Sequence, residues 1–155
     1  MSWSTFWLLC MCACYYCPIS IVCEQQKGNN TLSSILCDSV IIFISIQLLC
    51  ISTLFYEIIR YQLSSLFIVT LILGINGLLI YNETFIEHYI FSGIALISIY
   101  IFTIIHATEH RMCQLLLLPQ TFLLGACLIE KYIISYEILY IGLFAFTYLY
   151  LHVYG

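Results

Sequence analysis

Six long apolar runs, almost free of charged side chains, dominate this chain of 155 residues. A helix needs about 20 apolar residues to cross the roughly 30 Å of hydrocarbon in a bilayer, and most of the runs have that length. Backbone groups must satisfy one another in lipid, so continuous runs predict helices, whereas a barrel would show short alternating strands. The sequence therefore predicts an all-α integral membrane bundle with short loops, a single domain over residues 1–155. The six predicted transmembrane helices are 3–23, 35–56, 63–81, 89–107, 112–129 and 132–154.

The composition excludes several classes of protein. Hydrophobic residues make up 63% of the chain and charged residues 8%, against about 45–50% and about 25% in soluble domains. The net charge of −4 arises from acids and bases scattered over the loops, so no basic cluster indicates a nucleic-acid partner. Several of the nine cysteines lie within the apolar runs, where a cysteine behaves as a small hydrophobic residue.

The boundaries at the two ends of the chain depend on few residues. The first run, 3–23, lacks the basic region of a signal peptide, so we expect it to be retained. The last two runs are separated only by Glu130 and Lys131. One helix over 112–154 would be too long for a single crossing, so six spans are favoured and five remain the alternative. Pro119 lacks an N–H group and predicts a bend in the fifth span.

An even number of spans places both termini on one membrane face. The loops at 24–34 and 82–88 then lie on the other face, together with both glycosylation sequons, which begin at Asn29 and Asn82. Sequon acceptors belong to the lumenal side of secretory membranes. The basic residues divide evenly between the faces and give no orientation. We therefore expect Asn29 and Asn82 to be glycosylated, both termini to be cytosolic, and the membrane to be that of the ER, Golgi or lysosome.

His106 and His110 are four residues apart and would share one face of a helix. This is the spacing with which two metal ligands lie on one helix, and integral-membrane lipid hydrolases use it. Asp38 and His88, the further candidates, lie at the opposite membrane face in the predicted topology. An interfacial turn whose side chains meet water or headgroups is the favoured alternative. We expect no cofactor.

A few polar residues lie within or near the spans, and such residues usually face the interior of a bundle. The simplest interpretation of Asn76 and of its neighbours Gly74 and Gly77 is helix packing, through amide hydrogen bonds and close backbone approach. Glu137 differs, because a carboxylate one turn inside the sixth span is costly unless it is paired or protonated. A substrate contact at Glu137 therefore stays open.

His88, Asn76 and Glu137 are predicted at similar depths near the lumenal surface. Together they form the candidate pocket for a lipid headgroup. The further candidate headgroup contacts are Glu83 at the lumenal end and Arg60 and Arg111 at the cytosolic end.

Cys23 and Cys37 flank the first lumenal loop. An oxidising lumen permits a disulfide between them. Two free thiols at the membrane interface are the alternative.

Short motifs follow one another in a characteristic order along the chain. They are Pro18-Ile19-Ser20, Tyr56-Glu57-Ile58-Ile59-Arg60-Tyr61, Leu73-Gly74-Ile75-Asn76-Gly77, Asn82-Glu83, His88 with Gly93, and Glu137 with the aromatic end from Phe144 to Tyr150. In this order the chain resembles the Frag/DRAM/Sfk family of six-span proteins, which includes the DRAM autophagy modulators and Golgi factors that remodel GPI-anchor lipids. The first loop lacks the proline–glutamate pair that the family carries after the Pro-Ile-Ser element.

The resemblance implies an endomembrane protein that acts in lipid remodelling, lipid distribution or autophagy. The family has no agreed catalytic apparatus, so no residue takes a catalytic role from it. The favoured function is therefore an auxiliary, non-enzymatic one, with membrane lipids as partners. Two alternatives stay open: a structural subunit among other membrane-protein subunits, and a membrane lipid hydrolase that uses His106 and His110.

Overall fold

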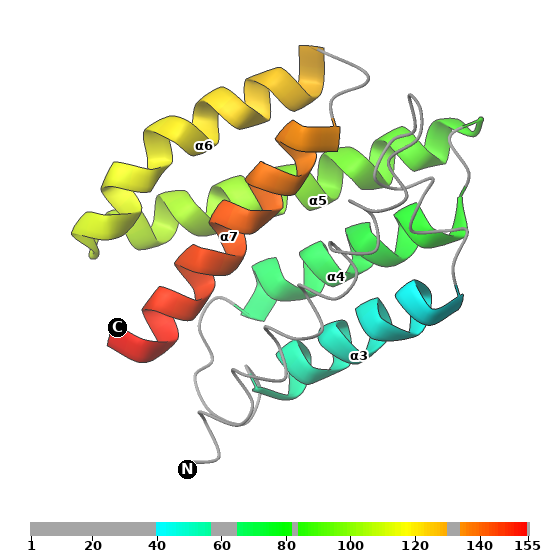
Figure 1. The fold of residues 1–155 in the computed structure, drawn as a ribbon, viewed down its shortest axis with the longest axis horizontal. Helices are drawn as coiled ribbons and strands as arrows, with labels where there is room; N and C mark the ends of the chain where they lie inside the picture. The colour runs from blue at the N-terminus through cyan, green and yellow to red at the C-terminus, as the bar shows by residue number, and fades with distance from the viewer. Residues whose placement is uncertain (1–39, 57–64, 82–83, 130–133, 155) are drawn as a thin grey trace.

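The computed structural model describes residues 40–56, 65–81, 84–129 and 134–154, and nearly all of these residues are helical (Figure 1). The helices are α3 Val40–Tyr56, α4 Ser65–Ile80, α5 Ile86–Ala107, α6 Arg111–Ile129 and α7 Ile134–Tyr154. This part of the chain contains five helices and no strand, so the all-α prediction is confirmed for it.

The helices lie where the apolar runs predicted them. The run over 112–154 is divided into α6 and α7, and α6 continues through Pro119. The predicted first span, 3–23, lies outside the described residues. One described helix, α5, is both long and apolar enough to cross a membrane, while Phe43–Leu54 and Leu66–Ile80 are shorter apolar helical stretches. The arrangement of six membrane-spanning helices is therefore a proposal.

The antiparallel pair α4 and α5 forms the centre of the structure (Figure 1). The helix α3 packs on α4, the helix α6 packs on α5, and α7 packs against both α6 and α5. Two clusters of buried apolar side chains join α4, α5, α6 and α7. One contains Ile68, Phe102, Cys113 and Tyr148, and the other contains Leu71, Ile99, Leu123 and Tyr140.

Two glycines allow α4 and α5 to approach closely. A Cβ atom at Gly74 would lie 2.8 Å from the backbone N of Ala95, and a Cβ atom at Gly77 would collide with the ring of Phe91. The ring of Phe91 stacks on Tyr81, with ring centroids 5.6 Å apart. Small residues at helix contacts let backbones approach, as the sequence predicted for this segment.

Many large apolar side chains are exposed, and several polar side chains are buried beside the apolar clusters. Among the described residues, 22 large apolar side chains are exposed, and they occur on every helix. Leu118, for example, is 79% exposed. The buried polar side chains of the same residues are His88, Ser98, Thr103, His106, Gln120, Thr147 and His152. Exposed apolar patches and buried polar groups are the informative departures from ordinary burial.

We expect Gly74→Ala to destabilise the fold by about 1–3 kcal/mol, because the new methyl group would collide with the backbone of Ala95, which cannot rotate away. Gly125→Ala in α6 is the matched control, since nothing lies within 4 Å of a Cβ at that position. The control should be neutral or slightly stabilising, because alanine favours helix more than glycine does. Thermal unfolding of the purified full chain measures both changes. Equal midpoints for the two variants would contradict the close approach.

Candidate functional site

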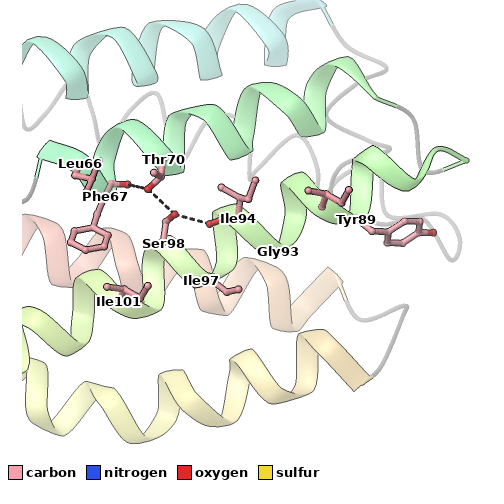
Figure 2. A pocket seen from close by; sticks show the side chains of 10 residues that line it. Leu66, Phe67, Thr70, Tyr89, Gly93, Ile94, Ile97, Ser98 and Ile101 are labelled. Atoms are coloured by element: carbon pink, nitrogen blue, oxygen red, sulfur yellow. Dashed lines mark hydrogen bonds between the residues drawn. The ribbon is translucent and has the colours of Figure 1, made fainter.

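A groove of about 450 Å³ lies between α4 and α5 on the outer face of the helix pair (Figure 2). Its lining residues are Leu66, Phe67, Thr70, Tyr89, Ile90, Gly93, Ile94, Ile97, Ser98 and Ile101. Small-molecule sites usually enclose about 300–1,000 Å³ and are mostly apolar with a few polar groups. The volume of the groove lies in this range and its lining is mostly apolar, while the groove itself is open rather than enclosed.

The groove is open because of the sequence of α5. Ile90, Gly93, Ile97 and Ile101 follow one another at intervals of three or four residues and so lie on one face of the helix. Gly93 has no side chain, and nothing lies within 4 Å of the position that its Cβ would occupy. A larger residue at Gly93 would fill the middle of the groove.

The hydroxyl groups of Thr70 and Ser98 lie in the wall of the groove, and both are hydrogen-bonded within the protein (Figure 2). A third hydroxyl-bearing residue, Tyr89, lies at the end of the groove. The Ser98 Oγ lies 2.9 Å from the Thr70 Oγ1 and 2.6 Å from the carbonyl oxygen of Ile94. The Thr70 Oγ1 donates in turn to the carbonyl oxygen of Phe67 at 3.0 Å. The hydroxyl protons of Thr70 and Ser98 are therefore each directed at a protein acceptor, so these two groups present no free donor to a ligand.

Other polar side chains join the helices in the interior. The Thr103 Oγ1 of α5 lies 2.8 Å from the Gln120 Oε1 of α6, and both side chains are fully buried. The Gln120 Nε2 has no hydrogen-bond partner among the described residues. The Tyr140 hydroxyl of α7 donates to the carbonyl oxygen of Leu96 at 2.8 Å. These contacts connect α5 to α6 and to α7.

Histidine and aromatic rings gather near the carboxyl ends of α5 and α7. The ring centroids of Phe102 and His106 are 4.5 Å apart, and those of Tyr148 and His152 are 4.1 Å apart. The His152 Nδ1 lies 2.7 Å from the carbonyl oxygen of Tyr148, and because a carbonyl only accepts, the proton is on Nδ1. The rings of Phe102 and Tyr148 connect the two pairs, with centroids 6.1 Å apart.

The predicted metal pair, His106 and His110, lies at the end of α5 and in the following turn. The two ring centroids are 6.4 Å apart, and His106 is buried beside Phe102. Within the described parts of the chain, no group of three His, Cys, Asp or Glu side chains is placed to hold a metal ion. The geometry therefore gives the metal interpretation no third ligand from these residues.

Asn76 and His88, members of the predicted headgroup pocket, each make a structural contact. Asn76 accepts from the Gln47 Nε2 at 2.7 Å and donates to the carbonyl oxygen of Ile72 at 2.8 Å, so it attaches α3 to α4. The His88 Nδ1 lies 2.8 Å from the carbonyl oxygen of Tyr81, beyond the end of α4. These contacts fit the helix-packing interpretation.

Glu137 lies in the first turn of α7, where a carboxylate is favoured by the helix dipole. Arg111 is the first residue of α6 and is exposed. The convergence of Glu137, His88 and Asn76 on one pocket stays a prediction. The remaining candidates lie outside the described residues, and they are Cys23, Asn29, Cys37, Arg60, Asn82 and Glu83.

The groove was not predicted from the sequence. Thr70 and Ser98 are ordinary members of apolar runs in the sequence, and Gly93 was noted only within a motif. One signal was present: a glycine and a serine five residues apart in α5, a helix otherwise rich in isoleucine. Their importance depends on the register with α4, which the sequence of either helix alone does not contain.

Comparison with protein families, with characterised proteins and with solved structures finds no match. A function for the chain must therefore be argued from its own residues.

We expect Thr103→Val to destabilise the protein by about 1–2 kcal/mol, because it removes the contact to the buried Gln120 amide. Gln120→Met should be better tolerated, since it removes an amide whose nitrogen already lacks a partner among the described residues. The double variant should recover most of the stability that Thr103→Val loses. Chemical unfolding of the four proteins forms the double-mutant cycle, and additive effects would show that the two side chains do not interact.

Proposed function

We propose that this chain is a six-span endomembrane protein with an auxiliary, non-enzymatic role in lipid organisation. The resemblance to the Frag/DRAM/Sfk family supports a role in lipid remodelling, lipid distribution or autophagy. Membrane lipids are the proposed partners. Both termini are proposed to be cytosolic.

The exposure of many large apolar side chains, together with the burial of several polar ones, is the observation that carries this proposal. Leaving a large apolar side chain in water forgoes about 1.5–3 kcal/mol, and the described residues expose 22 of them. In hydrocarbon the same surface carries no such cost, and polar groups prefer the bundle interior. Thr103, Gln120 and Thr147 are fully buried, as expected for polar side chains of a protein surrounded by hydrocarbon.

The positions of the charged residues support the same proposal. The described charged residues are Glu87, Glu109, Arg111 and Glu137, and each lies in the first turn of a helix or in a connecting turn. Helix ends are the positions at which a membrane-spanning bundle meets water and headgroups. The middle of every described helix is free of charge.

A structural role within a larger membrane complex is the second candidate. The exposed isoleucine, leucine and phenylalanine side chains could contact partner helices as well as lipid. Purification in mild detergent separates the two functions, because a subunit retains stoichiometric partners whereas an independent lipid-organising protein does not.

We expect the chain to resist carbonate extraction from membranes and to be glycosylated at Asn29 and Asn82. The physical reason is that the two sequons share one face in a chain of six spans. Glycosidase-sensitive mobility shifts in wild type, Asn29→Gln and Asn82→Gln measure this, and a tag after Gly155 should be accessible only from the cytosol. Release by carbonate would refute membrane integration, and a lumenal tag with a modified Asn29 would refute the even number of spans.

A further inference from the structure

We propose that the groove between α4 and α5 holds a single acyl chain of a membrane lipid, with the headgroup at the end marked by Tyr89. The inference deepens the proposed function and rests on it. The inference assigns a ligand class to a site that was not predicted from the sequence. Among the predicted headgroup contacts, His88 is the one that adjoins a lining residue, Tyr89, in the sequence.

The length of the groove matches one leaflet. Its lining on α5 extends from Tyr89 to Ile101, which corresponds to about 18 Å at about 1.5 Å per residue. Half of the hydrocarbon thickness is about 15 Å. Figure 2 shows Tyr89 at one end of the site and Phe67 and Ile101 at the other. An extended acyl chain that starts near Tyr89 would therefore run along α5 toward Ile101, where Leu66, Phe67 and Thr70 of α4 form the second wall.

The volume of the groove favours a thin ligand over an enclosed helix. A helix with its side chains is about 10 Å across, so a segment of this length would displace roughly 1,400 Å³. The groove offers about 450 Å³. The groove therefore cannot enclose a helix, whereas a thin, unbranched ligand can lie in it.

The chemistry of the walls also favours hydrocarbon. Leucine, isoleucine and phenylalanine side chains form most of the lining. Thr70 donates to the carbonyl oxygen of Phe67, and Ser98 donates to the carbonyl oxygen of Ile94 or to the Thr70 Oγ1, so neither proton needs an acceptor from the ligand. A headgroup placed beside them would lose its hydration without gaining a donor.

The Tyr89 end is suited to the membrane interface. Tyr89 is 54% exposed, and tyrosine is enriched at the boundary between hydrocarbon and headgroups. Glu87 lies beside it in the first turn of α5 and is also exposed. The headgroup would therefore meet a polar helix end while the acyl chain extends toward Ile101.

Photolabelling tests the assignment. The full chain is incorporated into phosphatidylcholine vesicles that contain a phosphatidylcholine probe with a diazirine on one acyl chain, and the labelled peptides are identified by mass spectrometry. Wild type should carry label on the peptides that line the groove. Gly93→Leu should lower that label about tenfold. The leucine side chain would overlap the bound acyl chain, and we expect the free-energy cost to be similar to that of overpacking a core.

Gly125→Leu is the matched control, because Gly125 is also a helical glycine with nothing within 4 Å of its Cβ position but lies on α6, away from the groove. It should leave the groove label unchanged. Leu66→Trp fills the groove from the α4 wall at an exposed position, and it keeps the test decisive if Gly93→Leu fails to fold.

Equal groove label in wild type, Gly93→Leu and Leu66→Trp would overturn the inference. Label on the outer face of α6, near Leu118, without label in the groove would also overturn it and leave the proposed function intact. Absence of label from every helix, with release of the protein by carbonate, would instead refute membrane integration and the inference with it.

Discussion

The close contact of α4 with α5 at two glycines determines much of the rest of the structure. Gly74 against Ala95 and Gly77 against Phe91 fix one antiparallel register for the pair. In that register Thr70 lies opposite Ser98, and their hydroxyl groups are 2.9 Å apart. The groove opens along the same interface, because α5 carries Gly93 on its outer side. Packing and the candidate site therefore have a common origin.

The helices could be predicted from the sequence because their signal is local. Long apolar runs, interrupted by residues such as Glu109 and Arg111, specify where a helix begins and ends, and α5 and α6 lie where those interruptions placed them. The close approach at Gly74 and Gly77 was also predicted, since small residues in an apolar helix indicate a packing face. The membrane crossing of each helix stays a proposal.

The site could be predicted only in part, because its geometry depends on pairs of helices. Asn76 was recognised as a residue that joins helices, but its partner, Gln47, became evident only from the packing of α3 on α4. Thr70 gave no signal, and Ser98 gave one only through its spacing from Gly93, because a single hydroxyl in an apolar run is satisfied by its own helix as readily as by another. Their pairing requires the register that the glycines set.

The internal hydrogen bonds of Thr70 and Ser98 explain why we assign the groove a lipid ligand rather than a catalytic role. Catalysis requires side chains with free donors, acceptors or ligand positions directed at a substrate. Between the two helices, the hydroxyl groups of Thr70 and Ser98 are hydrogen-bonded to each other and to the carbonyl oxygens of Phe67 and Ile94. Because these hydroxyl groups are hydrogen-bonded within the protein, the surface around them is effectively apolar. Such a surface can recognise the shape of a hydrocarbon chain. In a bilayer this recognition comes from packing, because lipid tails are as apolar as leucine and the hydrophobic effect does not distinguish them.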